Sequence, residues 1–339
     1  MKFYKLLFFI SMIIGTLMAI SSYSWFGMWM GLEINMISIM PLFSNSKNMY
    51  TSEASIKYFL TQALASMIIL FSIILLSTMS SMLNEVMNET ESIFSIMLNS
   101  ALLTKMGAAP FHFWFPEVIE GLNWSNSLIL LTWQKIAPMI LLMYNSKISL
   151  FFFSIIIFCM IISSIMGFNQ ISLRKILAFS SINHIGWMIS ALLNSKIIWF
   201  LYFIIYSIIS INIIFIFKKF KMYFLNQMIM IFNSNPLLKM FFILNFFSLG
   251  GIPPFLGFLP KWLIINSLTL NSQYLLSFLM IIFTLMTFYF YMRVTFSSLI
   301  INFDTPFISS IKIENFYMMV FNFIALSSLI LFPLFFNFY

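Results

Sequence analysis

Long apolar runs, separated by short polar segments, extend along the whole chain. A helix needs about 20 apolar residues to cross a hydrocarbon core of about 30 Å, and a chain in lipid must pair its backbone groups internally. The sequence lacks the alternating apolar and polar positions of a membrane β-barrel. The pattern therefore predicts an all-α polytopic membrane protein whose eleven spans lie at about 3–20, 25–43, 54–79, 92–110, 125–145, 148–168, 174–194, 197–217, 237–267, 273–297 and 316–336.

The segments between these runs are short. The longest hydrophilic stretches, at about 80–91, 218–236 and 298–315, cannot bury a core of their own. We therefore expect residues 1–339 to form a single transmembrane domain. The first run follows Lys2 and resembles a signal peptide, but it has no small-residue cleavage site, so we interpret it as a retained span.

The composition agrees with a membrane location. Hydrophobic residues make up 62% of the chain and charged residues only 8%, whereas an ordinary soluble domain is about 25% charged. So little charge cannot cover a surface that faces water. The frequent use of Phe, Ile, Met, Asn, Lys and Tyr is typical of an AT-rich coding genome, such as a mitochondrial one.

Metal and nucleotide chemistry would need residues that are scarce in this sequence. It has one cysteine, Cys159, and two histidines, His112 and His184, too few for a zinc, haem-attachment or iron–sulfur ligand set. No glycine-rich nucleotide-binding motif is present. We therefore expect the chain itself to bind no cofactor and no metal.

The positions of the basic residues test the predicted spans. Loops on the cytoplasmic or matrix side of a membrane are enriched in Lys and Arg, so topology explains the net charge of +8 better than nucleic-acid binding does. Two cations, Lys147 and Lys196, fall on one side, and three, Lys105, Lys135 and Lys261, fall inside spans. We predict that the N-terminus lies on the matrix or cytoplasmic side, which collects the remaining cations: Lys2, Lys5, Lys47, Lys57, Arg174, Lys175, Lys218, Lys219, Lys221, Lys239, Arg293 and Lys312.

One segment of the sequence recurs. Gly107–Glu117 aligns without gaps with Gly251–Lys261, and glycine, proline, phenylalanine and proline recur at the same spacing. Gly and Pro interrupt helical hydrogen bonding, and paired discontinuous helices are typical of inverted-repeat transporters. The breaks fall in spans four and nine, so we predict two inverted five-helix repeats, at about 1–145 and 148–297, and one terminal helix at about 316–336.

Four ionisable residues lie within or beside apolar runs: Glu33, Lys105, Lys135 and Lys261. Such residues are expensive in lipid and persist where they are paired, hydrated or functional. Burial lowers the pKa of a lysine and a nearby carboxylate raises it, so a lysine beside a movable carboxylate can switch between charged and neutral states. We interpret the four residues as a proton relay, in which Glu33 and Lys105 form a pair.

Structural roles are the alternatives for these residues. Glu33 and Lys105 could form an ion pair that only locks two helices together. Lys135 could extend toward the interface, although its central position in a span argues against this. Lys261 follows a proline and could lie at an interface.

Other polar residues allow two interpretations each. We include His184 as a fifth candidate for the relay, although it could equally be a hydrogen-bonded packing residue. His112 lies at the first break, where a structural role is favoured. Arg174–Lys175 and Lys218–Lys219 are topology determinants or contacts to phospholipid head groups.

These residues lie in longer segments: WMGLEIN, TSEASIKYFLTQALAS, KMGAAPFHFWFPEVIEGL, TWQKIAP, LRKILAFSSINHIGW and SLGGIPPFLGFLPKW. The segments resemble the NADH dehydrogenase subunit 2 family, which comprises antiporter-like core membrane subunits of animal mitochondrial respiratory complex I. The resemblance extends over nearly the whole chain. Animal members of the family lack three N-terminal helices of their bacterial relatives, which agrees with eleven spans.

The resemblance implies the site, the cofactors and the partners. The family's glutamate falls on Glu33, and its three lysines fall on Lys105, Lys135 and Lys261. NADH oxidation, FMN, the iron–sulfur clusters and ubiquinone reduction are then expected chiefly in other subunits, and this chain acts as a translocase in the mitochondrial inner membrane. Its expected partners are other membrane subunits of complex I, including neighbouring antiporter-like subunits, and phospholipids.

Three functions are therefore distinguished. The leading hypothesis is a proton-translocating subunit of NADH:ubiquinone oxidoreductase, with protons entering from the matrix side near Lys135. A free-standing cation/proton antiporter would instead show sodium-dependent transport by the isolated chain. A structural membrane spacer would keep its embedded charges only for assembly.

Overall fold

The computed structural model shows helices along nearly all of the residues that it describes, which are 3–44, 48–80, 87–146, 149–232 and 236–300. Within these ranges the only β-type pairing is an isolated bridge between Ser172 and Phe224. Eight helical segments there are long and apolar enough to cross a membrane. The predicted all-α, multi-pass membrane fold is confirmed. The chain divides into two compact units, Met1–Phe158 and Cys159–Tyr339.

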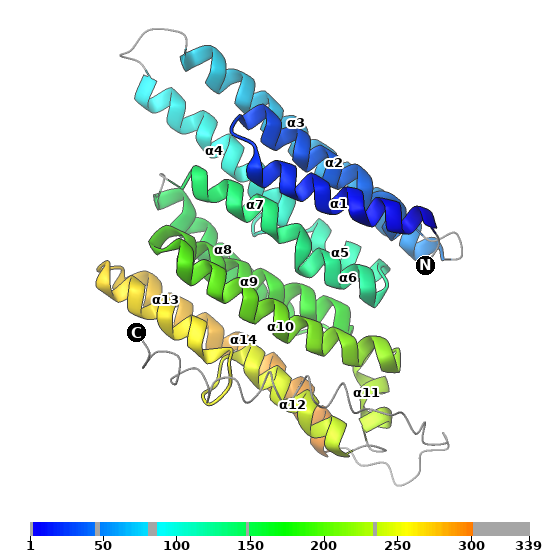
Figure 1. The fold of residues 1–339 in the computed structure, drawn as a ribbon. Coiled ribbons are helices and arrows are strands. Elements are labelled where there is room, and N and C mark those ends of the chain that lie inside the picture. The colour runs from blue at the N-terminus through cyan, green and yellow to red at the C-terminus, as the bar shows by residue number, and fades with distance from the viewer. Residues whose placement is uncertain (1–2, 45–47, 81–86, 147–148, 233–235, 301–339) are drawn as a thin grey trace, which may run out of the picture. The chain divides into compact units, whose positions relative to one another are not determined.

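The first unit is built from paired helices (Figure 1). Its elements are α1 (Phe3–Ser21), α2 (Trp25–Phe43), α3 (Met49–Ser80), α4 (Met87–Met106), α5 (Trp114–Gly121), α6 (Trp124–Leu131), α7 (Trp133–Tyr144) and the first half of α8 (Ser149–Gly167). Helix α1 packs along α2, and α3 packs along α4, while α7 contacts both α1 and α4. Small residues let α1 and α2 approach closely, because a Cβ atom on Gly31 would lie only 2.4 Å from the amide nitrogen of Ala19.

The second unit is arranged around one buried helix. Its further elements are α9 (Leu173–Asn194), α10 (Lys196–Phe220), α11 (Leu225–Phe232), α12 (Pro236–Gly250), α13 (Phe258–Leu270) and α14 (Tyr274–Ile300). Every residue of helix α9 from Ile176 to Leu192 is buried, which is typical of a core helix. Helices α10, α13 and α14 all contact it.

Hydrogen bonds fix the connection between α8 and α9. The guanidinium of Arg293, on α14, donates to the carbonyl oxygens of Phe168 and Gln170, the latter at 2.7 Å. The amide of Leu173 donates to the carbonyl oxygen of Tyr223 at 3.0 Å. A planar guanidinium can serve two acceptors at once, so one side chain holds this loop against α14.

Most of the predicted spans coincide with helices. The span predicted at 316–336 lies outside the described residues. Helices α5 and α11 were not predicted, because eight residues are too few to form an apolar run that could cross a bilayer. The division into inverted repeats stays a prediction.

The span predicted at 125–145 is confirmed as the apolar segment Trp124–Tyr144, which is long enough to cross a membrane, although one residue interrupts its helix. Its two halves, α6 and α7, meet at Thr132. Pro138 has no N–H for the carbonyl of Gln134, which disturbs the turn before it. The amide of Lys135 donates to the carbonyl oxygen of Thr132 at 3.2 Å, a three-residue step that is tighter than the four-residue step of an α-helix.

Candidate functional site

Three lysine side chains are buried, and they are the only buried Lys, Arg, Asp or Glu among the residues whose side chains the structure describes. Lys105 is 6% exposed, Lys135 is 1% exposed and Lys261 is 7% exposed. They are the same three cations that the topology count placed inside spans. An ammonium group in apolar surroundings costs several kcal/mol, so each of these side chains needs groups around it that stabilise its charge.

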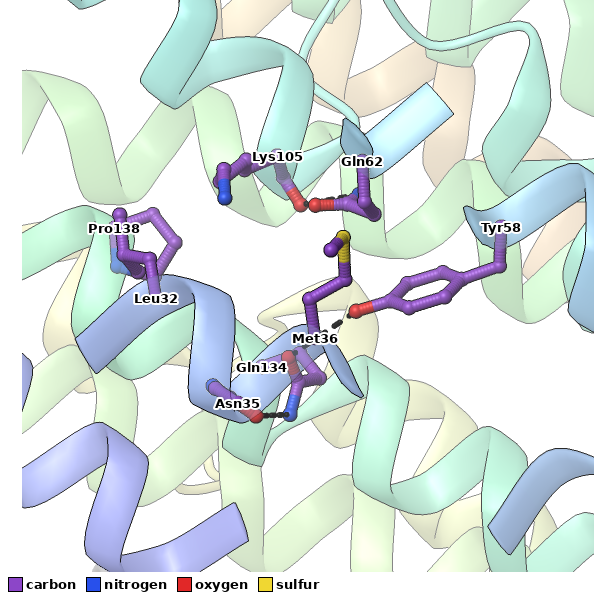
Figure 2. Close-up of a pocket in the computed structure, with 8 residues that line it drawn as sticks. All are labelled: Leu32, Asn35, Met36, Tyr58, Gln62, Lys105, Gln134 and Pro138. Carbon is purple, nitrogen blue, oxygen red and sulfur yellow. Dashed lines mark hydrogen bonds between the residues drawn. The ribbon is translucent and has the colours of Figure 1, made fainter. Parts of the chain in front are cut away.

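Lys105 lies in the last turn of α4, beside a small polar cavity (Figure 2). The cavity has a volume of about 10 Å³, which is room for about one water molecule. Helices α2, α3, α4 and α7 supply its lining: Leu32, Asn35, Met36, Tyr58, Gln62, Lys105, Gln134 and Pro138. The C-terminal end of a helix carries a partial negative charge, which attracts a cation.

The backbone of Lys105 is held from α3. The side-chain amide of Gln62 donates to its carbonyl oxygen at 3.3 Å. The last carbonyl groups of a helix have no partner within the helix, so this bond satisfies one of them. Trp114, which begins α5 after the break, donates from its indole nitrogen to the carbonyl oxygen of Thr104 at 3.1 Å.

The opposite wall of the cavity is a hydrogen-bonded bridge across three helices. The Nε2 group of Gln134, on α7, donates to Oδ1 of Asn35, on α2, at 3.0 Å. The hydroxyl of Tyr58, on α3, donates to Oε1 of Gln134 at 3.4 Å. Asn35 and Tyr58 are each 3% exposed. Gln134 precedes Lys135 directly, so the bridge joins the surroundings of Lys105 to the helix turn that carries the central lysine.

Glu33 does not form the predicted ion pair with Lys105. The described residues contain no salt bridge within 4.0 Å between them, although the two charges interact electrostatically. Helical geometry explains the separation. Leu32, Asn35 and Met36 share one face of α2 and line the cavity, whereas Glu33 is rotated away from that face and is half-buried.

Lys135 is the most deeply buried of the lysines and lies in the first turn of α7. Its Nζ atom lies 5.7 Å from the centroid of the Phe115 ring, on α5. This distance is within the range of a cation–π interaction, about 6 Å. The interruption at Thr132 lies three residues before Lys135 in the chain.

The two predicted helix breaks have the same local backbone. Gly107 and Gly251 adopt φ angles of 74° and 79°, a left-handed conformation that favours glycine. In each break the residue after the glycine donates to the carbonyl five residues earlier, from Ala108 to Leu103 and from Ile252 to Phe247. This is the Schellman ending of a helix. The peptide bonds before Pro110 and Pro254 are both cis.

Lys261 reaches back across the second break. It lies in the first turn of α13, yet its Nζ atom donates to the carbonyl oxygens of Gly250 at 2.7 Å and of Leu249 at 3.5 Å. These carbonyls form the C-terminal end of α12, which stabilises a cation. The same Nζ atom lies 5.8 Å from the centroid of the Trp187 ring, on α9.

The two histidines occupy different surroundings. His184 is 4% exposed on α9, and its Nδ1 atom lies 2.7 Å from the hydroxyl oxygen of Tyr202. Its ring also lies 4.9 Å from that of Tyr206. His112 sits in the first break, where Nδ1 lies 3.2 Å from the carbonyl oxygen of Pro110. Across the described ranges, no group of three or more His, Cys, Asp or Glu side chains could hold a metal ion.

The sequence reasoning missed the uncharged members of the site. It did not select the polar residues Asn35, Tyr58, Gln62 and Gln134 or the rings of Phe115 and Trp187. A signal existed for part of this set, since Tyr58 and Gln62 stand one helical turn apart in an apolar run.

Comparison with known proteins places these features in a family. The family described as NADH:quinone oxidoreductase/Mrp antiporter, transmembrane region, matches residues 22–287. The NADH-ubiquinone oxidoreductase chain 2 of Anopheles gambiae is 47% identical over 333 residues, which is 96% of this chain and 96% of that protein. The chain belongs to the NADH-ubiquinone oxidoreductase chain 2 family.

Other members and a solved structure agree. The NADH-ubiquinone oxidoreductase chain 2 of Aedes aegypti is 49% identical, over 88% of this chain and 86% of its own length. A chain in the structure of respiratory complex I from Thermus thermophilus with bound aureothin is similar in fold, with a TM-score of 0.87 at 21% identity. That match covers 98% of this chain and 79% of the other. The resemblance that the sequence motifs indicated is confirmed.

Proposed function

We propose that this chain translocates protons across the mitochondrial inner membrane as a membrane subunit of respiratory NADH:ubiquinone oxidoreductase. The observation that carries the proposal is the position of the buried lysines. Lys105 directly precedes the first helix break, Lys135 follows the interruption between α6 and α7, and Lys261 follows the second break. Backbone that leaves the helix at membrane depth supplies polar groups and room for water.

The chemistry of the lysines fits proton transfer. An ammonium group donates a proton and the resulting amine accepts one, without any other covalent change. We assign Lys135 to the entry of protons from the matrix side. Glu33 acts on Lys105 through its charge rather than through a direct salt bridge, and Lys261 and His184 continue the relay in the second unit.

The redox chemistry belongs to other subunits in this proposal. NADH, FMN, the iron–sulfur clusters and ubiquinone are bound elsewhere in the complex, and this chain is the translocase that uses the released energy. The names of the relatives support membership of that enzyme complex. The neighbouring antiporter-like subunits and phospholipids are its proposed contacts.

The proposed orientation places the N-terminus in the matrix. The distribution of basic residues supports it, because Lys and Arg outside the spans gather on that side. Arg174–Lys175 and Lys218–Lys219 are among them, and anionic head groups would meet them there.

The proposal is tested by the number of protons moved per electron in the intact complex that carries Lys105→Met. Methionine keeps an unbranched side chain of similar length and removes the titrating group. We expect this ratio to fall while the complex still assembles. Lys57→Met is the control, because Lys57 is exposed and pairs with Glu53 and Glu117. An unchanged ratio in Lys105→Met would contradict the proposal.

A further inference from the structure

Each unit contains a buried lysine whose ammonium group faces an aromatic ring. Phe115 faces Lys135 in the first unit, at 5.7 Å from Nζ to the ring centroid, and Trp187 faces Lys261 in the second, at 5.8 Å. Both rings are 1% exposed. The negative face of an aromatic ring attracts a cation, and the attraction is strongest where water is excluded.

Both ring–lysine pairs lie against the glycine of a helix break. A Cβ atom on Gly107 would lie 2.9 Å from the ring of Phe115, and one on Gly251 would lie 2.8 Å from Cδ of Lys261. The geometry of each break therefore fixes one member of the pair. In the second unit the ammonium is held between the carbonyls that end α12 and the ring of Trp187.

No hydrogen bond within the described part of the chain holds the indole of Trp187 in place. Its Nε1 group is buried and has no hydrogen-bond partner in the described part of the chain. An unsatisfied buried N–H group is unfavourable, and an aliphatic or phenyl side chain would avoid that cost. Of the aromatic side chains, however, tryptophan has the ring that binds cations most strongly.

A ring also suits a group that must exist in two charge states. When a lysine that is paired with a carboxylate loses its proton, the carboxylate is left as an uncompensated buried charge. A neutral ring and neutral carbonyl groups leave no such charge. The described residues contain no salt bridge to Lys261, so its charge can be lost without this penalty.

We propose that Phe115 and Trp187 are positioning residues for proton transfer, each holding the ammonium of its lysine by a cation–π interaction beside a helix break. This inference rests on the proposed function, since it assigns the rings to lysines that carry protons. It predicts that the aromatic character of the two positions matters more than their volume.

The test measures protons moved per electron, and the rate of proton transfer, in the assembled complex. We expect Trp187→Leu and Phe115→Leu to slow proton transfer by about 2- to 30-fold, the range that a cation–π interaction supplies. Trp187→Phe and Phe115→Tyr should recover most of the rate, because both keep a ring. Trp199→Leu and Phe152→Leu are the controls, since both side chains are buried and pack against another aromatic ring, Phe203 and Phe151 respectively.

A second measurement separates ring–cation contact from packing. If the ring acts on the ammonium, the loss in melting temperature caused by Trp187→Leu will be smaller in a Lys261→Met background than in the native chain. Equal losses in both backgrounds, together with equal proton-transfer rates for Trp187→Leu and Trp187→Phe, would overturn the inference. Normal pumping by Lys261→Met would overturn its role in the proposed function as well. If Lys261→Met impairs pumping but Trp187→Leu and Phe115→Leu transfer protons at the native rate, the inference is overturned and the proposed function is not.

Discussion

The ammonium of Lys261 donates a 2.7 Å hydrogen bond to the carbonyl oxygen of Gly250, eleven residues earlier in the chain. The bond spans the second helix break and joins the start of α13 to the end of α12. Lys261, for which the sequence left an interfacial position as the alternative, is therefore buried against backbone.

Removal of this charge should affect function more than stability. Lys261→Met loses a charged hydrogen bond of about 1.5–3 kcal/mol, but it also removes a desolvation penalty of several kcal/mol. We expect the melting temperature of the complex to be unchanged or raised, while proton translocation falls. Lys196→Met, at an exposed position, is the control for both measurements. A large drop in melting temperature would show that Lys261 is kept for structure.

The glycines of the two breaks should resist substitution. Alanine at Gly107 or Gly251 must adopt a positive φ angle, which costs about 1–2 kcal/mol, and its Cβ atom would press on Phe115 or Lys261. Thermal unfolding of the complex should show this loss for either variant. Gly27→Ala is the matched control, since Gly27 has no positive φ angle and a Cβ atom there would lie 3.0 Å from its nearest neighbour, the side chain of Ser22. Equal melting temperatures for all three variants would contradict the described break geometry.

The bridge at the Lys105 cavity should depend on its central amide. Gln134→Leu leaves the polar groups of Asn35 and Tyr58 without their partner, at a cost of about 1–3 kcal/mol. Tyr58→Phe removes only the longer bond, of 3.4 Å, and should cost less. Denaturation of the complex measures both. In the double variant, Asn35→Leu should recover part of the stability that Gln134→Leu loses. If it recovers none, the bridge does not act as a unit.

A substitution at Tyr202, the hydrogen-bond partner of His184, distinguishes a proton-relay role of His184 from a packing role. In the relay, Tyr202→Phe removes the hydroxyl that meets Nδ1 at 2.7 Å and should slow proton translocation in a fully assembled complex. A packing role predicts a modest loss of about 0.5–1.5 kcal/mol in stability with native translocation. Parallel measurements of melting temperature and proton movement separate the two. Tyr274→Phe, at an exposed tyrosine, is the control.

Features encoded locally could be predicted from the sequence. A membrane span is a long apolar run, so α1 and α10 are visible without any tertiary information. Lys105, Lys135 and Lys261 are conspicuous because ionisable residues are rare in such runs. The repeated glycines, Gly107 and Gly251, marked both breaks correctly.

Features that depend on the rotation of helices and on the contacts between them could not be predicted from the sequence. Glu33 and Lys105 were expected to pair, but the face of α2 that meets the cavity carries Asn35 instead. The bridge through Gln134 depends on contacts among three helices, and neutral polar residues in spans are too common to single it out. The interruption at Thr132 lies six residues before Pro138, outside the turn that this proline disturbs, so the sequence did not mark its position.

The most direct test of proton transfer through the buried lysines compares Lys135→Met with Lys135→Arg in the intact complex. Arginine keeps the positive charge but does not lose its proton in proteins, so it supports a structural charge and not a relay. We predict that both variants move fewer protons per electron than the native complex, measured on assembled protein. A native ratio in Lys135→Arg would contradict the account, because it would show that the charge of Lys135 suffices without its titration.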